Sequence, residues 1–248
     1  MKLLYIPDLQ VKPGVSLKHL THISKFIADK QPDVVVQGGD LWDMPSLSSY
    51  DRGRKAAEGR RVTRDWEAGC EAVATLMGSV NYKHKFQWVF TEGNHEDRLR
   101  RYAEDNPAID NLPNPCEYLR GLGWKVHPFL SVATIGGVRF SHIFPRTSTG
   151  RVTGHSARNG PASALAMVRA NMASCVMGHR QGLDMAVYNT GSKTYYGLIA
   201  GSCYTHQEEY LTPQYTNYWR GVILMHRVKN GTFDPCFVSL DYLKERYG

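Results

Sequence analysis

The sequence lacks any pairing pattern among its cysteines. Their number is odd and their spacing wide, with no Cys-x-x-Cys arrangement among Cys70, Cys116, Cys175, Cys203 and Cys236. A disulfide framework or a zinc knuckle needs paired or closely spaced cysteines. We therefore expect free thiols, which are typical of proteins in a reducing compartment.

Long hydrophobic runs are also missing. Only four apolar residues separate Lys2 from Pro7, too few for the apolar core of a secretory signal peptide. No stretch approaches the ~18 apolar residues of a transmembrane helix. These absences predict a cytoplasmic protein with no membrane partner. Repeats, low-complexity tracts and linkers are absent too, so we expect a single domain spanning residues 1–248.

Acidic residues are outnumbered by basic ones. The chain has 30 Lys and Arg against 23 Asp and Glu, which gives a net charge of +7 at pH 7. An excess of positive charge favours a polyanionic partner, but the placement of the charge matters more than its sum.

Hydrophobic spacing predicts alternating strands and helices in the first part of the chain. Short apolar runs indicate three buried strands, at residues 2–7, 34–37 and 86–91. Apolar residues recur at the spacing of one helix face over two segments, residues 17–30, with Ser16 as the N-cap, and residues 65–80. The strand–helix–strand order predicts an α/β sheet covered on both faces.

The second part of the chain indicates more β structure. Residues 124–143 contain two strand-like pieces around a Gly-Gly turn, and residues 161–171 read as a helix with Pro161 in its first turn. A short strand follows in the fragment SCVMGH. Residues 185–240 show short alternating pieces with Gly-rich and Asn-Gly turns, as expected of antiparallel strands.

Polar side chains gather where the predicted strands end, in the fragments IPDLQ, VVVQGGDLWD, VFTEGNHE, VRFSHIF and VMGHRQ. Together these fragments supply Asp8, Gln10, Asp40, Asp43, Asn94, His95, His142, His179 and Gln181. Ligand sites in α/β sheets form outside the carboxyl ends of strands. Carboxylate, amide and imidazole groups are ligands for Mn²⁺, Fe or Zn²⁺, and the oxygen donors also suit Mg²⁺. Any one of these residues could be an ordinary turn or core residue. Their occurrence together at successive strand ends predicts a metal site.

These fragments resemble the motifs of the calcineurin-like metallophosphoesterases. That family carries D-x-H, G-D-x-x-D, G-N-H-[ED], a lone His and G-H-x-H in this order, and the match runs from residue 3 to about residue 181. The resemblance implies a four-layer α-β-β-α fold, a β-sandwich flanked by helices. It also implies two divalent metal ions about 3.5 Å apart.

The resemblance also implies roles for individual residues. Asp40 matches the bridging ligand, and the remaining ligands of one ion are Asn94, His142 and His179. The ligand positions of the other ion fall on Asp8, Gln10 and Gln181. His95 matches the histidine that assists the leaving group, and Asp43 matches the carboxylate that orients it.

The chain departs from the family pattern at two positions, Gln10 and Gln181, where histidines are usual. Both changes fall on the same ion, whose ligands would all be oxygen atoms, which suits Mn²⁺, Mg²⁺ or Ca²⁺ better than Zn²⁺ or Fe. Three arrangements remain open: a second ion bound loosely, most consistent with Mn²⁺ or Mg²⁺; a single ion; or a replacement ligand from His155 or His206. Asp-x-Gln is typical of phage-encoded family members, which implies the host cytoplasm.

Basic residues follow two of the metal motifs directly: Arg52, Arg54, Lys55, Arg60, Arg61 and Arg64 after GDLWD, and Arg98, Arg100 and Arg101 after GNHE. One interpretation is an ordinary solvated helix face. The other is a track for a phosphate backbone, with Arg98 gripping the scissile phosphate. Arg52, Arg54, Arg98, Arg101 and, in the segment 145–160, His155 are the candidate substrate-binding residues.

The sequence therefore favours a metal-dependent phosphodiesterase acting on nucleic acid, most simply a DNA nuclease that uses Mn²⁺. Tyrosines late in the chain offer stacking surfaces for unpaired bases or are ordinary packing. A phosphomonoesterase is the main alternative. A non-catalytic nucleic-acid binder is a further one, against which the presence of Asn94 and His95 argues.

Overall fold

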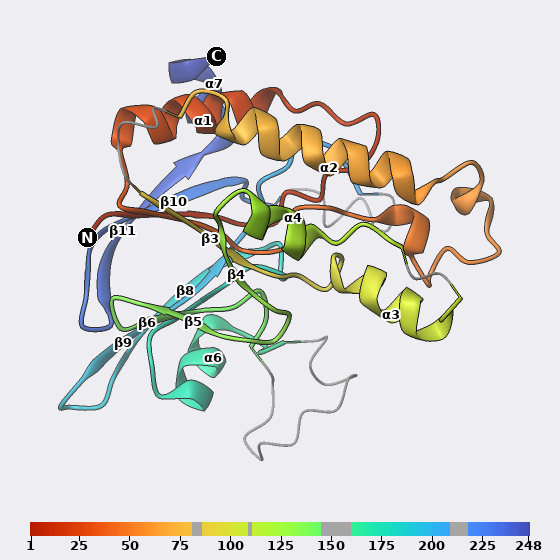
Figure 1. The fold of residues 1–248 in the computed structure, drawn as a ribbon. Helices are drawn as coiled ribbons and strands as arrows, with labels where there is room; N and C mark the ends of the chain where they lie inside the picture. Colours follow the sequence, from red (N-terminus) through yellow and green to blue (C-terminus); the bar gives the residue numbers. More distant parts are fainter. Residues whose placement is uncertain (81–85, 109–110, 145–159, 209–217) are drawn as a thin grey trace.

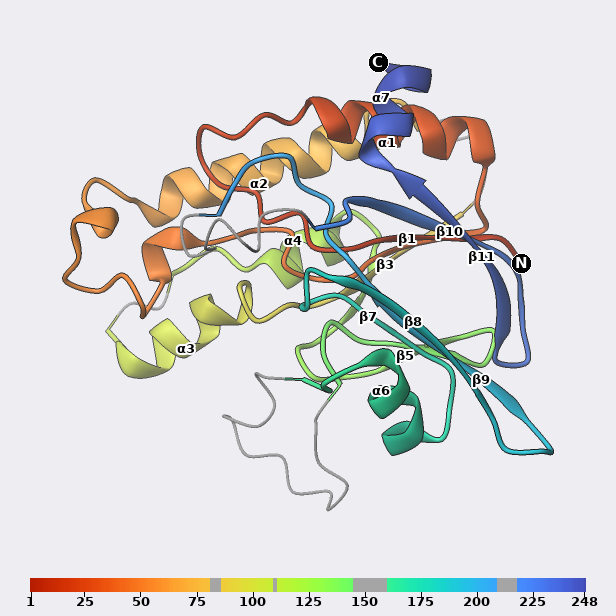
Figure 2. The same cartoon turned by 180° about the vertical axis from the view of Figure 1, so that it is seen from behind.

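Two β-sheets pack face to face, and helices cover both outer faces (Figures 1 and 2). The structure is a computed structural model that describes residues 1–80, 86–108, 111–144, 160–208 and 218–248. This is the four-layer α-β-β-α arrangement expected from the sequence. No helix among the described residues is both long enough and apolar enough to cross a membrane.

The first sheet has six strands in the order β11-β10-β1-β2-β3-β4. Its strands are β1 (Leu3–Ile6), β2 (Val34–Gln37), β3 (Gln87–Thr91), β4 (Lys125–His127), β10 (Gly221–Lys229) and β11 (Thr232–Ser239). Strands β1 to β4 run parallel, and the antiparallel hairpin of β10 and β11 joins the edge of β1. Asn230 and Gly231 form the hairpin turn, both with positive φ, as a two-residue turn of this kind requires.

The second sheet has five strands in the order β5-β6-β7-β9-β8. They are β5 (Ala133–Ile135), β6 (Val138–Phe140), β7 (Cys175–Met177), β8 (Leu183–Asn189) and β9 (Thr194–Ala200). Residues 124–143 thus hold three strands, not two, because β4 belongs to the first sheet and only β5 and β6 flank the Gly-Gly turn.

Alternation along the short strands builds separate cores on the two faces of the first sheet. Leu3 and Tyr5 of β1 face the second sheet and pack with Phe140 and Leu198. Leu4 and the other side chains on the opposite face of this sheet pack against helices. These helices are α1 (Lys18–Lys30), α2 (Val62–Met77), α4 (Pro115–Gly121) and α7 (Leu240–Tyr247). On the far side, α6 (Ala164–Asn171) covers the second sheet (Figure 2).

Three helices differ in detail from the sequence-based prediction. Helix α1 has Leu17 rather than Ser16 at its N-cap, without a side-chain cap hydrogen bond. Helix α2 lies three residues earlier than the predicted segment. Helix α6 begins at Ala164, because the side chain of Ser163 accepts the N–H of Ala166 and caps it, so Pro161 lies before the helix.

Three further helices among the described residues were not predicted: α3 (Asp97–Asp105), α4 and α7. In α7 the side chain of Ser239 caps the helix by accepting the N–H of Tyr242.

Candidate active site

The segment after β1 runs alongside the segment after β2. The N–H groups of Leu9 and Gln10 both donate to the carbonyl of Asp40, at 3.0 and 2.8 Å. The N–H of Asp43 donates to the carbonyl of Val11 at 2.9 Å. The apolar run of β1 therefore ends in Asp8 because the strand stops there and the chain pairs with the polar loop after β2.

Glu96 fastens the loop after β3 to the loop after β2. Its carboxylate accepts the N–H groups of Gly93 at 2.9 Å, Trp42 at 2.9 Å and Asp40 at 3.1 Å. Burial, reinforced by the charge of Asp40, raises the pKa of Glu96 to about 7. In the sequence, Glu96 is visible only as the last position of the G-N-H-[ED] motif, and nothing there predicts that it joins the two loops.

The strand-end loops approach each other more closely than side chains would allow. A Cβ atom at Gly93 would lie 2.1 Å from Oδ1 of Asp40, and one at Gly178 would lie 2.3 Å from Oδ1 of Asp8. The backbone of Asp40 and of His179 has positive φ, +49° and +62°. Such backbone costs about 1–3 kcal/mol per residue and gathers at functional sites.

Four side chains converge on one point. Oδ1 of Asn94 lies 3.1 Å from Nε2 of His142 and 2.8 Å from Nδ1 of His179. Oδ2 of Asp40 lies 3.4 Å from the same Nε2 of His142. Atoms that bind one ion at about 2.0–2.2 Å lie about 3 Å apart, so this spacing fits a metal site.

The surroundings of His142 favour a cation between these four side chains. Its Nδ1 lies 2.8 Å from the carbonyl oxygen of Gly38, so Nδ1–H donates there and Nε2 faces the oxygens of Asn94 and Asp40. Burial lowers the pKa of His142, but the charges of Asp40 and Asp8 outweigh it and raise the value to about 10. A metal ion would take the place of that proton.

Asp8 offers a second ligand position. It is fully buried; its Oδ1 accepts the N–H of His179 at 3.0 Å, and its Oδ2 has no hydrogen-bond partner among the described residues. Burial, with help from Asp40 and against the charge of His142, raises the pKa of Asp8 to about 7. A buried carboxylate oxygen without a donor fits a metal ligand.

Gln10 and Gln181 line the same cleft as Asp40. The side-chain oxygen of Gln181 accepts the hydroxyl of the buried Tyr204 at 2.7 Å. The donor set at this second position is thus carboxylate and amide oxygen, which fits a hard divalent cation.

His95 lies between a carboxylate and a guanidinium. Its Nδ1 is 2.8 Å from Oδ1 of Asp43, and its Nε2 is 3.0 Å from Nη2 of Arg98. Since a guanidinium only donates, Nε2 accepts there and Nδ1 carries the proton. Burial would raise the pKa of Asp43, but His95, Arg98 and Lys12 outweigh it and keep that carboxyl ionised.

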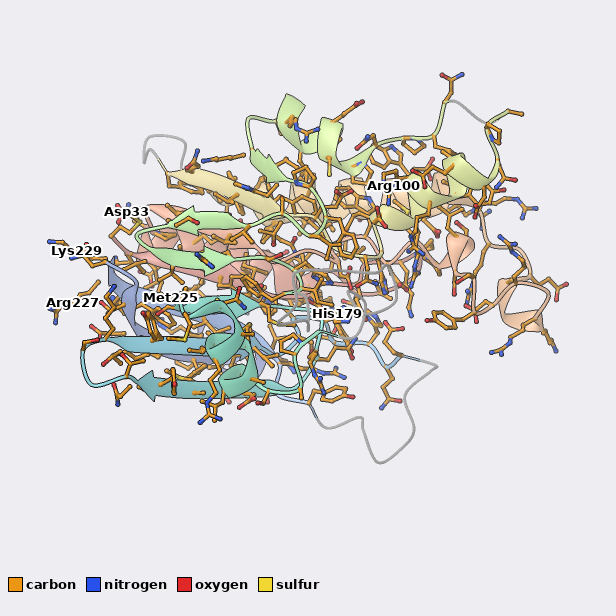
Figure 3. All side chains as sticks on the ribbon, turned by 90° about the horizontal axis from the view of Figure 1, so that it is seen from below. Asp33, Arg100, His179, Met225, Arg227 and Lys229 are labelled. Atoms are coloured by element: carbon orange, nitrogen blue, oxygen red, sulfur yellow. The ribbon has the colours of Figure 1, made fainter. Side chains whose placement is uncertain are left out.

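The cleft over these residues has a volume of about 540 Å³ and includes both Arg60 and Arg98 in its lining. Figure 3 shows His179 at the end of the sheets opposite Asp33 and Lys229, which mark the start of β2 and the end of β10. The cleft therefore opens outside the carboxyl ends of the parallel strands, where the sequence predicts the site.

The other candidate substrate-binding residues lie elsewhere. Arg52 and Arg54 are exposed on the loop before α2 and do not line the cleft. Arg101, on α3 (Asp97–Asp105), donates to the carbonyl of Asn94 at 3.2 Å and pairs with Asp97. His155 falls in residues 145–159, outside the described residues.

Two further residues of the cleft have no signal in the sequence. The ammonium of Lys12 lies 2.7 Å from Oε2 of Glu208 and 3.7 Å from Oδ2 of Asp43. Glu208 is 196 residues away along the chain, so no local pattern links it to the site.

The model of the calcineurin-like phosphoesterases matches residues 1–154. The chain belongs to this family. It is a metal-dependent phosphoesterase, and divalent metal ions are its cofactors. The matched residues carry seven of the nine strand-end polar residues, up to His142; His179 and Gln181 lie beyond them.

The phosphoesterase is similar to two phage proteins, the gene 54 proteins of Mycobacterium phages D29 and L5. They are 28% and 27% identical to it over 185 residues, which are 64% of this chain and 70% of each relative.

Two solved structures show a distant likeness. A dimetal phosphatase from Danio rerio is 11% identical, with a TM-score of 0.40 over 91% of this chain and 92% of its own. GAP50 of Plasmodium, described as the anchor in the inner membrane complex, is 8% identical, with a TM-score of 0.37 over 96% and 89%. At such TM-scores a likeness indicates neither activity nor ligand.

Proposed function

We propose that this phosphoesterase is a nuclease that hydrolyses phosphodiester bonds in DNA, with Mn²⁺ as its ion, in the cytoplasm of a phage-infected cell. The phage relatives support the setting. The all-oxygen donor set of Asp8, Gln10 and Gln181 supports Mn²⁺ over Zn²⁺, because hard oxygen ligands favour the harder ion.

The observation that carries this proposal is the continuation of the cleft. A second hollow of about 310 Å³ shares Lys12, Pro45 and Arg60 with it and adds Arg61 and Arg64 to the lining. A groove that extends past the metal ligands and gathers arginines suits a polymer of phosphates better than a small monoester.

Two tyrosines support the same substrate. Tyr50, which is 75% exposed, and Tyr218 both line the cleft. A large aromatic side chain exposed at a cleft offers a surface on which an unpaired base can stack. Both rings therefore favour single-stranded DNA, or a duplex opened near the scissile bond.

The residues divide the chemistry between them. Divalent ions held by the strand-end ligands would polarise the phosphate and make a water acidic enough to attack it. Arg98 leaves His95 and binds a phosphate oxygen, a contact that guanidinium groups make well.

His95 then completes the reaction. With Arg98 withdrawn, Nε2 of His95 takes up a proton from solvent, and this proton passes to the leaving oxygen as the P–O bond breaks. Asp43 keeps the ring oriented through Nδ1.

The experiment that tests this proposal compares DNA with a small diester. The double variant Arg61→Gln/Arg64→Gln should raise KM for single-stranded DNA about 10-fold and lower the salt dependence of binding by about two phosphate contacts. Its turnover of bis(p-nitrophenyl) phosphate should match the wild type. Arg227→Gln is the control, because this exposed arginine lies at the far end of the molecule (Figure 3). If the protein hydrolyses phosphomonoesters but leaves DNA uncleaved, the proposal of a nuclease is wrong.

A further inference from the structure

Lys12 joins two nearly buried carboxylates in the cleft. Its Nζ lies 2.7 Å from Oε2 of Glu208 and 3.7 Å from Oδ2 of Asp43, whose side chains are 3% and 9% exposed. Two carboxylates at such low exposure repel each other strongly unless a cation lies between them. Lys12 contacts both carboxylates.

The backbone holds Lys12 beside Asp43. Val11 pairs with Trp42 in an isolated parallel bridge, and the N–H of Asp43 donates to the carbonyl of Val11 at 2.9 Å. Lys12 is the next residue, so its side chain starts from a backbone that is tied directly to Asp43. The contact between Lys12 and Asp43 is therefore set by the backbone as well as by the conformation of the lysine side chain.

The opposite end of the bridge is equally well fixed. Nε2 of His206 lies 2.5 Å from Oε1 of Glu208, and the His206 ring stacks on Tyr204 with centroids 4.6 Å apart. Arg220 lies over the Tyr204 ring at 5.0 Å, and the N–H of Cys203 donates to the carbonyl of Asp8 at 2.8 Å. Contacts within a packed segment thus fix the position of Glu208.

The two oxygens of Asp43 have different partners. Oδ1 lies 2.8 Å from Nδ1 of His95 and 3.6 Å from Nη1 of Arg98, and Oδ2 faces the ammonium of Lys12. The contact of Lys12 with Oδ2 therefore influences how the carboxylate is oriented toward His95.

We propose that Lys12 is a positioning residue of the phosphoesterase, held by Glu208, which keeps Asp43 aimed so that His95 presents Nε2 to the leaving oxygen. The inference rests on the proposed role of His95 in leaving-group departure. It assigns Lys12 no contact with the substrate, because the ammonium is already engaged by two carboxylates.

The test compares leaving groups. A p-nitrophenolate leaves without help, whereas the alkoxide of a dinucleoside phosphate needs a proton. Lys12→Met should lower kcat on the dinucleoside phosphate about 10–100-fold, the range for groups that orient a functional side chain. It should change kcat on bis(p-nitrophenyl) phosphate by less than about 3-fold and leave KM for both substrates unchanged. Lys12→Arg should keep most of the activity.

A double variant separates this role from simple charge balance. Lys12→Met takes the ammonium away from the buried Glu208 and should lower the melting temperature, and adding Glu208→Gln should restore it, since the uncompensated charge is gone. The low kcat on the dinucleoside phosphate should persist in the double variant. Recovery of that kcat together with stability would overturn the proposal.

A spectroscopic signature tests the geometry directly. In protein labelled with ¹⁵N at histidine, the Nδ1–H signal of His95 should be present in the wild type and Lys12→Arg and be lost to exchange in Lys12→Met. An unchanged signal would contradict the proposal, as would equal losses on both leaving groups or a rise in KM alone.

The same experiments keep the two proposals distinguishable. Whether the wild type hydrolyses diesters or only monoesters tests the nuclease. If only monoesters react, the comparison runs with p-nitrophenyl phosphate and an alkyl phosphate, and the ratio of the two kcat losses still tests Lys12.

Discussion

The hydroxyl of Tyr204 donates to the side-chain oxygen of Gln181 across 2.7 Å, inside the wall of the cleft. This bond fixes which end of the amide faces Tyr204. In the proposed metal site, where Gln181 binds the second ion, Tyr204 supplies the orienting contact that a ligand of a metal ion needs.

The first prediction concerns this contact. Tyr204→Phe removes only the hydroxyl, and we expect the weaker of two Mn²⁺ binding steps to weaken roughly 10-fold while the tighter step is unchanged. Isothermal titration calorimetry of the metal-free protein measures both steps. Tyr196→Phe, on β9 and away from the cleft, is the control. Equal affinities in wild type and variant would show that the Tyr204 hydroxyl does not orient a metal ligand.

The tighter step should depend on the convergent imidazole and amide ligands. We expect His142→Ala to weaken Mn²⁺ binding more than about 100-fold, since even groups that only orient ligands contribute about 10–100-fold. His226→Ala changes an exposed histidine of β10 and should bind as the wild type does. Retention of both steps in His142→Ala would contradict the metal site described here.

Glu96 should contribute mainly to stability. Glu96→Ala leaves three N–H groups without their buried acceptor, and we expect a loss of roughly 3 kcal/mol in the free energy of unfolding of the metal-free protein. Denaturant titration measures the loss. Glu104→Gln, at an exposed site on α3, is the matched control and should change stability by less than about 0.5 kcal/mol. A wild-type value for Glu96→Ala would mean that other bonds join the two loops.

Stability should also depend on pH through His19. Burial, assisted by the nearby His206, lowers the pKa of His19 from 6.5 to about 4. The unfolded chain takes up a proton near pH 6.5 and the folded protein does not until about pH 4. The contribution of His19 to stability is therefore full above pH 6.5 and falls between these two values, by up to roughly 3 kcal/mol. Asp8 and Glu96, whose folded pKa values are raised to about 7, act in the opposite direction in this window.

Denaturant titrations of the metal-free protein across this pH window check the prediction. The stability of His19→Leu relative to the wild type should rise by up to roughly 3 kcal/mol as the pH falls from 6.5 to 4, because a leucine takes up no proton. His226→Gln should keep a constant difference from the wild type. A constant difference for His19→Leu as well would contradict the prediction.

The strand-end residues could be predicted because each signal is local. Asp40, Asn94 and His142 each follow a short apolar run directly, and the parallel strands bring such ends to one edge. The pairs Gln181–Tyr204 and Lys12–Glu208 could not be predicted, because they join segments through tertiary packing and leave no spacing in the sequence.

The basic residues show the same limit. Arg98 reaches the cleft because α3 starts directly at the end of the motif loop, whereas Arg52 and Arg54 follow their motif at a distance and point to solvent. A residue that follows a metal motif can be placed in the cleft from the sequence only when few residues separate it from the motif. The start of α6 was misplaced for a related reason, since the side chain of Ser163, rather than Pro161, sets it.

Cleavage of end-labelled single-stranded DNA with increasing Mn²⁺, by the wild type and by His95→Ala, tests the central claim most directly. We expect Mn²⁺-dependent cleavage by the wild type and a loss of about 10²–10⁴-fold in the variant, the contribution of a group that transfers a proton to the leaving oxygen. Mn²⁺ binding should be equal in both proteins. Intact DNA at saturating Mn²⁺, or equal cleavage by both proteins, would contradict the account.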